Sequence, residues 1–417
     1  MAPVGRAETT TLPAGLERRA TATAVVAERA GELAAACAAV ADRILGGGRL
    51  IAVSGTEASA DAHHLAVEFL HPALVGKRAV PAFALVCATG AEAARGLTLL
   101  GAAADSVVVI GRTPDDPVVR EALRTARGLG MLTLALVPDP YPPHWPHPPH
   151  PPHSPRLPHP PHRAGHVLAV PSGDPLVVKE VHVTAYHLLW ELTQLFLEHE
   201  GPGGDDYDFL GGTLDRRALL DDAAEAIRAK AAETTALRAR VVTGLGPELA
   251  RCGRRLASAF RDGARLFAFG NGGSATDASD LAATFLSPPR GRAVPAWALP
   301  DDTAVVTALT NDIGFDVVFA RQLEALARPG DVAVGLSTSG GSANVVRGLD
   351  RARRRGMLAV GLAGHDGGAM AAPGLADHLF VVPSRSVHRV QEAQATISHL
   401  LWELVQEELC ASGCPDG

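Results

Sequence analysis

Two loops rich in glycine and serine, both in the second half of the chain, carry residue types suited to phosphate binding. They are Phe269-Gly-Asn-Gly-Gly-Ser-Ala275 and Leu336-Ser-Thr-Ser-Gly-Gly-Ser-Ala343, and each follows a short apolar run and opens a helical stretch. Glycine permits a close backbone approach, and the N–H groups and dipole of a helix start favour an anion. Either loop alone could be an ordinary Gly/Ser turn between a strand and a helix. The presence of both loops is harder to explain in that way. The hydroxyls suit a phosphate monoester, and no Gly-x-x-x-x-Gly-Lys-Ser/Thr segment occurs, so we expect no nucleotide cofactor.

The elements that position these loops are short apolar runs alternating with helical stretches. This alternation predicts βαβ units and a parallel sheet. A long helical region precedes the runs in each half, at about 17–45 and 215–260, and an amphipathic helix closes each half, at about 177–198 and 388–410. The runs include Leu50-Ile-Ala-Val53, Val107-Val-Val-Ile110, Leu266-Phe-Ala-Phe269, Val332-Ala-Val-Gly-Leu336 and Leu358-Ala-Val-Gly-Leu362.

The chain repeats itself. His187-Leu-Leu-Trp-Glu-Leu192 recurs as His399-Leu-Leu-Trp-Glu-Leu404, and Pro81-Ala-Phe-Ala-Leu85 recurs as Pro295-Ala-Trp-Ala-Leu299. Matches in the same order along both halves indicate a duplication. We therefore predict two related domains, at 1–200 and 207–417, joined by a polar Gly-rich linker, with a Pro/His-rich insertion at 138–166 in the first.

Composition narrows the functional class. The 417 residues are 47% hydrophobic, as in a folded protein, and the net charge of −7 argues against nucleic-acid binding as the main activity. No apolar run is long enough to span a membrane, and the N-terminus has no secretory signal pattern. The cysteines are scattered and odd in number, which favours reduced thiols. We expect a cytoplasmic protein that binds neither membranes nor nucleic acid.

Together with further segments in order, the two loops resemble the sugar isomerase (SIS) fold, and more specifically the phosphoheptose isomerase family. The further segments are Thr310-Asn-Asp-Ile-Gly-Phe-Asp316, Arg328-Pro-Gly-Asp331, Gly364-His-Asp-Gly-Gly368 and Arg389-Val-Gln-Glu392. The resemblance implies an α/β fold: two tandem SIS domains, each a parallel-sheet α-β-α sandwich with N-terminal helices. It implies aldose–ketose isomerisation of sedoheptulose 7-phosphate to D-glycero-D-manno-heptose 7-phosphate, or of a similar sugar phosphate. The phosphate would be held by Asn271, Ser274, Ser337, Thr338, Ser339 and Ser342.

The resemblance also implies acid–base residues. Glu68 matches the base that moves a proton between C1 and C2 through an enediol, and His187 or His399 matches the partner acid. His64 and Glu68 are four residues apart and share one helical face. The family holds zinc with such side chains in at least some members, which here implies His64, Glu68 and His187, with Gln391 possible.

The two halves keep different parts of this machinery. In the second half Asp280 and Thr284 replace the His and the Glu, whereas in the first half Glu57 and the carboxylates of 111–116 replace the phosphate loops. On one helix, Ser274 and position 284 are ~15 Å apart, more than the roughly 10 Å from phosphate to C1. The hypothesis is a composite site between the halves, with a homodimer rebuilding a four-domain assembly. The alternative is decay of both halves into a non-catalytic SIS module that senses sugar phosphate or binds a protein.

Three features stay open at this level. Asp312 matches the family's Asn-Asp pair near the substrate, or it caps a helix. Lys179 replaces a Gln and either supplies positive charge that weakens metal binding or reflects drift. The Pro/His tract is either a surface loop or a metal-binding segment.

Overall fold

The computed structural model describes residues 11–72, 76–139, 165–200 and 215–411, and the chain divides into two compact units. The N-terminal unit is Arg18–Thr235, and the C-terminal unit comprises, among the described residues, 11–17 and 236–411. Helices α1 (Thr11–Glu28) and α7 (Arg216–Arg261) contribute residues to both units. The predicted domain limits stay a prediction, since the linker and most of the Pro/His insertion lie outside the described residues.

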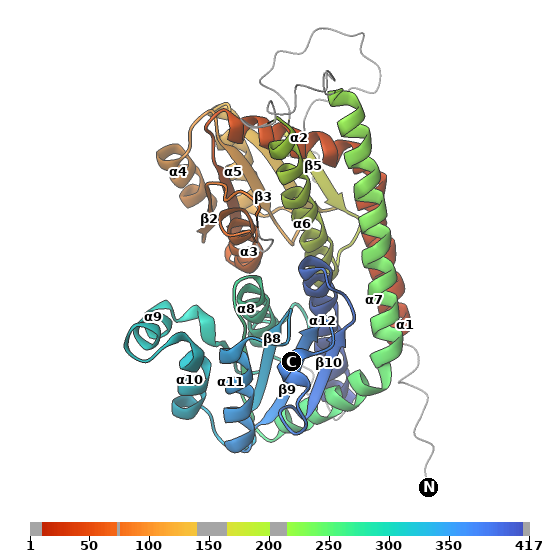
Figure 1. The fold of residues 1–417 in the computed structure, drawn as a ribbon, viewed down its shortest axis with the longest axis vertical. Coiled ribbons are helices and arrows are strands. Elements are labelled where there is room, and N and C mark those ends of the chain that lie inside the picture. Colours follow the sequence, from red (N-terminus) through yellow and green to blue (C-terminus); the bar gives the residue numbers. More distant parts are fainter. Residues whose placement is uncertain (1–10, 73–75, 140–164, 201–214, 412–417) are drawn as a thin grey trace. The chain divides into compact units, whose positions relative to one another are not determined.

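The N-terminal unit (red to yellow-green in Figure 1) is built on a parallel sheet. Its five strands have the order β2-β1-β3-β4-β5. Its strands are β1 (Leu50–Gly55), β2 (Ala82–Cys87), β3 (Ser106–Ile110), β4 (Leu132–Pro138) and β5 (Gly165–Val170). Successive side chains of a strand face opposite sides of the sheet. The even positions Leu50 and Ala52 therefore join one core cluster, and the odd positions Ile51 and Val53 join the other.

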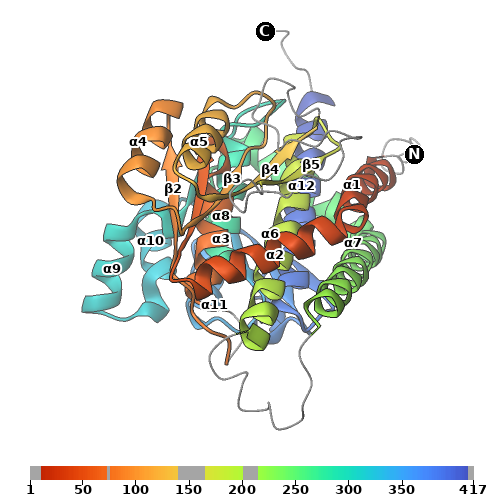
Figure 2. The ribbon, with the colours of Figure 1, turned by 90° about the horizontal axis from the view of Figure 1, so that it is seen from above.

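Helices cover both faces of this sheet (Figure 2). One face packs against α2 (Ala30–Leu45), α3 (Ser59–Leu70) and α6 (Pro175–Glu200), and the other against α4 (Gly90–Leu100) and α5 (Pro117–Gly128). A short 3₁₀ turn, η1 (Thr56–Ala58), joins β1 to α3. The helix α6 includes the first copy of the repeated His-Leu-Leu-Trp-Glu-Leu segment.

The C-terminal unit repeats this topology. Its parallel sheet has the order β10-β9-β8-β6-β7, which read backwards is the N-terminal order. The strands are β6 (Leu266–Phe269), β7 (Ala296–Ala298), β8 (Val332–Ser337), β9 (Leu358–Gly364) and β10 (His378–Val382). Arg49 pairs with Asp105 in one unit as Arg265 pairs with Asp331 in the other, at 2.8 and 2.6 Å. The prediction of two α/β copies, each with a parallel sheet, is confirmed.

The helices of the C-terminal unit also repeat, with one addition. Its α8 (Gly273–Leu286), α11 (Ala343–Arg354) and α12 (Val387–Ala411) correspond to α3, α5 and α6. Between β7 and β8 lie α9 (Thr303–Asp312) and α10 (Val318–Leu326), with the short turns η3 (Leu299–Asp301) and η4 (Phe315–Val317), while η5 (Gly368–Ala371) follows β9. Within the described residues, no helix combines the length and apolarity needed to cross a membrane.

Candidate functional site

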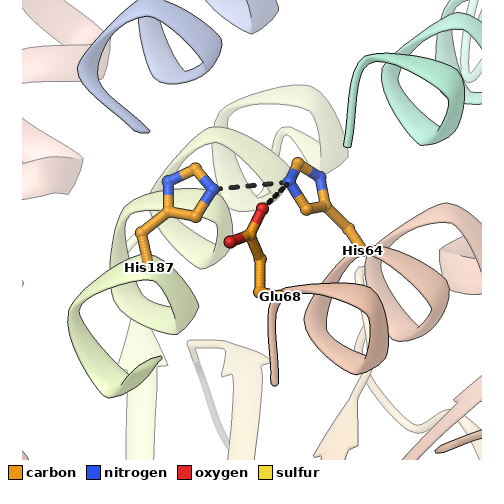
Figure 3. Close-up of side chains that lie close together, drawn as sticks. All are labelled: His64, Glu68 and His187. Carbon is orange, nitrogen blue, oxygen red and sulfur yellow. Dashed lines mark hydrogen bonds and ion pairs between the residues drawn. The ribbon is translucent and has the colours of Figure 1, made fainter. Parts of the chain in front are cut away.

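Three predicted side chains converge inside the N-terminal unit. His64 and Glu68 lie on α3 and His187 on α6, and Figure 3 shows their polar ends turned toward one another. His64 Nε2 is 3.4 Å from His187 Nε2 and 3.6 Å from Glu68 Oε1. All three residues are buried, with at most 3% of the surface of any of them exposed. The helical spacing of His64 and Glu68 and the contact of α3 with α6 create this cluster.

The cluster has the character of a metal site. One ligand atom from each of the three residues lies within 4.8 Å of the others. Two imidazole nitrogens and a carboxylate form a donor set used by catalytic zinc, which keeps a fourth position for water or substrate. When two imidazole nitrogens face each other, there is room between them for one proton at most. The alternative is a cation to which both nitrogens turn their lone pairs. The residues present therefore fit the metal that the resemblance implies.

A layer of charge lies beside this cluster. Arg112 Nε donates to Asp61 Oδ2 at 2.8 Å, and Lys179 Nζ lies 3.7 Å from Asp61 Oδ1. Asp61, Arg112 and Lys179 are all buried. Sequence reasoning singled out Lys179 but missed Arg112, whose partner is distant in sequence.

A neutral histidine is buried in the same unit. Burial lowers the pKa of His182 to about 4, so its imidazole is neutral at neutral pH.

Carboxylates occupy the N-terminal counterparts of the phosphate loops. Thr113 Oγ1 donates to Glu57 Oε1 at 3.0 Å, and Asp116 caps α5 by accepting from Val118 N at 2.7 Å. Burial, and secondarily the charge of Glu57, raises the pKa of Asp116. Carboxylates at these positions disfavour an anionic ligand.

The C-terminal unit brings three predicted phosphate-binding serines together. Ser337 Oγ lies 3.0 Å from Ser342 Oγ and 3.5 Å from Ser339 Oγ. Ser342 is the N-cap of α11, but its side chain makes no capping hydrogen bond, so its hydroxyl faces the other serines instead. Thr338, in the same loop, is half-buried. The convergence of hydroxyls at a helix start is an arrangement that can hold a phosphate.

The two loops of the C-terminal unit are tied to each other. Asn271 Nδ2 donates to Asn344 Oδ1 at 2.9 Å, and Asn344 Nδ2 donates back to Asn271 Oδ1 at 2.8 Å. Ser274 is buried in the first turn of α8, and its N–H donates to Asn271 O at 3.0 Å. The sequence patterns did not point to Asn344. Its position directly after Ser342-Ala343, in the turn from loop to helix, could have marked it as a residue of the phosphate loop.

Glycine at position 340 fixes the second loop. Gly340 has φ +65°, and a Cβ there would lie 2.1 Å from Gly367 O. We expect Gly340→Ala to lower the free energy of unfolding by about 2 kcal/mol or more and to displace the serines, because it adds backbone strain and a backbone clash. Urea unfolding with phosphate-binding measurements checks this. Gly341→Ala is the matched control, since its Cβ would meet only Ser339 Oγ, at 3.5 Å; equal effects of both changes would contradict the argument.

The remaining predicted residues belong to the C-terminal unit. His399 Nε2 lies 3.3 Å from Asp280 Oδ2, and Thr284 Oγ1 donates to the backbone oxygen of Asp280 at 2.8 Å. Gln391 is buried on α12, and Asp312 ends α9, exposed, accepting from Asn311 Nδ2 at 2.8 Å. In the described part of the chain, no second set of three metal-ligating side chains converges.

Comparison with known proteins assigns the family. The protein-family model of the SIS domain matches residues 231–364. The phosphoheptose isomerase of Pelobacter propionicus is 43% identical over 195 residues, which are 46% of this chain and 100% of the relative. That of Aquifex aeolicus is 46% identical over 157 residues, 37% of this chain and 81% of the relative. The chain belongs to the phosphoheptose isomerase family, a family of sugar-phosphate isomerases. A whole family member thus matches less than half of this chain, in agreement with duplication.

A solved structure extends the likeness to nearly the whole chain. The C-terminal domain of glucosamine-fructose-6-phosphate aminotransferase from Francisella tularensis covers 93% of this chain, with 95% of its own length matched and a TM-score of 0.56. Its sequence identity is 10%, so this match concerns the fold alone.

Proposed function

We propose that the chain is an aldose–ketose isomerase that converts sedoheptulose 7-phosphate to D-glycero-D-manno-heptose 7-phosphate. The observation that carries the proposal is the buried convergence of His64, Glu68 and His187 in a member of this family. A carboxylate held beside two imidazoles, away from water, suits proton transfer next to a carbonyl.

In the proposed reaction Glu68 takes the proton from C1 of the ketose and returns it to C2 of the aldose. His187 or His399 exchanges a proton with the carbonyl and hydroxyl oxygens, so that the enediol forms and collapses without free charge. The serines of the second loop, with Asn271 and Ser274, hold the phosphate. Asp312 and Gln391 are proposed to contact the sugar.

Zinc is proposed to bind His64, Glu68 and His187. When bound, it would act as a Lewis acid on the substrate's oxygens. The chain's own part is to hold these three side chains in one orientation within the protein interior.

We further propose a composite site to which both halves contribute. The support is the complementary loss: the N-terminal half keeps the base but carries carboxylates in its phosphate loops, and the C-terminal half keeps the loops but has Thr284 in place of the base. If each half had lost its functional residues independently, the losses would not be expected to complement each other in this way. The working assembly is proposed to be a homodimer with four SIS domains, which light scattering on the purified chain tests.

Turnover in D₂O tests the function. The purified chain, with and without added zinc, is incubated with sedoheptulose 7-phosphate and followed by NMR. We expect the aldose to form with deuterium at C2, because the proton carried by Glu68 exchanges with solvent. Binding of the sugar phosphate without turnover would instead assign the chain to the sensing or adaptor class.

A further inference from the structure

One buried carboxylate in the N-terminal unit faces two buried cations. Asp61 is entirely buried, with Arg112 on one oxygen at 2.8 Å and Lys179 near the other at 3.7 Å. A buried ammonium is costly unless a charge or a function compensates it. The carboxylate of Asp61 forms an ion pair with each of the two cations.

The C-terminal half has uncharged residues at the positions that correspond to Lys179 and Arg112. The repeated His-Leu-Leu-Trp-Glu-Leu segment aligns Lys179 with Gln391. Counting from the equivalent strand pairs β1–β3 and β6–β8 aligns Arg112 with Thr338. The half that keeps the His64–Glu68–His187 cluster therefore has two cations where the half without it has neutral side chains.

The charged layer and the cluster are neighbours on the same two helices. Asp61 precedes His64 by three positions on α3, and residues so spaced are about 5–6 Å apart at Cβ. Lys179 precedes His187 by about two turns on α6, on the same helical face. The ammonium of Lys179, 3.7 Å from Asp61 Oδ1, therefore lies in the protein interior on the two helices that carry the cluster, where charges act over longer distances than in water.

We propose that Lys179 is a built-in cation that sets the metal affinity of the His64–Glu68–His187 cluster. Its charge opposes the charge of a divalent cation held by the cluster and so weakens metal binding. Lys179 is a positioning residue that acts through the metal. The inference rests on the metal site of the proposed function and deepens it.

Zinc affinity of the full-length chain tests this, measured by competition with a chromophoric chelator. We expect Lys179→Met to bind zinc at least about tenfold more tightly than the wild type, because one opposing charge is removed. Lys179→Gln should tighten binding at least as much, since its amide can also act as a ligand. Lys179→Arg keeps the charge and should match the wild type. Lys77→Met removes another lysine of the same unit, one that pairs with Glu198 at 2.5 Å, and should leave the affinity unchanged.

The result that overturns the inference is equal zinc affinity in Lys179→Met, Lys179→Arg and the wild type. Both neutral variants leave Asp61 paired with Arg112, so we expect them to fold, which thermal melting checks. If neither folds, the wild type still decides: it should bind zinc no more tightly than the micromolar range, and nanomolar binding would refute the role of Lys179. His187→Ala added to Lys179→Met separates the proposals. Undiminished zinc binding there would refute the metal site, whereas diminished binding together with equal affinities of Lys179→Met and the wild type would refute the charge effect alone.

Discussion

Glu68→Gln is expected to lower kcat for sugar-phosphate isomerisation by about 100- to 10,000-fold, the range typical of a lost general base. The amide has nearly the shape of the carboxylate but cannot accept the C1 proton. Because the proposed phosphate ligands lie in the C-terminal half, KM should change only a few-fold. The steady-state rate and the incorporation of solvent deuterium at C2 measure the effect, and both should fall together.

Glu57→Gln provides the matched control for this change. Glu57 is an exposed carboxylate of the same unit that accepts a hydrogen bond from the Thr113 hydroxyl, and it lies outside the proposed machinery. We expect its kcat and KM to equal those of the wild type. A Glu68→Gln enzyme with wild-type turnover would remove Glu68 from the reaction and with it the division of roles between the halves.

Much of the fold followed from local sequence signals. Alternating apolar runs gave the central strands, and the repeated segments gave the second copy of the domain. The edge strands β5 and β10 were not anticipated, because five or six residues in a half-buried edge position carry a weak pattern. Their place is decided by pairing with β4 and β9, which is a tertiary effect.

The candidate site divides in the same way. The helical spacing of His64 and Glu68 was readable from the sequence, and the repeated segment drew attention to His187. Asn344 pairs with Asn271 across 73 positions and Arg112 with Asp61 across 51, and neither pairing leaves a periodic signal. Such contacts depend on which loops the parallel sheet brings to its carboxyl edge. The sequence therefore indicated which residue types could do the chemistry. Their hydrogen-bond and ion-pair partners became visible only in the folded sheet.

Replacement of Ser337 and Ser342 by alanine together is expected to weaken binding of sugar phosphate by about 100-fold or more. Hydrogen bonds to a charged group contribute about 1.5–3 kcal/mol each, so two lost hydroxyls exceed a hundredfold change in Kd. The cost to folding should be small, because Ser342 makes no side-chain cap of α11 and the two hydroxyls bond each other. Calorimetric titration of the full-length chain with sedoheptulose 7-phosphate measures the effect.

The N-terminal half supplies the control for this pair. Thr113→Ala alters the counterpart of Ser339, where the hydroxyl already donates to Glu57, and should leave the affinity unchanged. The same titration gives the stoichiometry, which we expect to be one sugar phosphate per chain, because carboxylates stand in the N-terminal phosphate loops. Two bound molecules per chain, or a double variant that binds as the wild type does, would show that phosphate recognition lies elsewhere and that the halves have not divided the work.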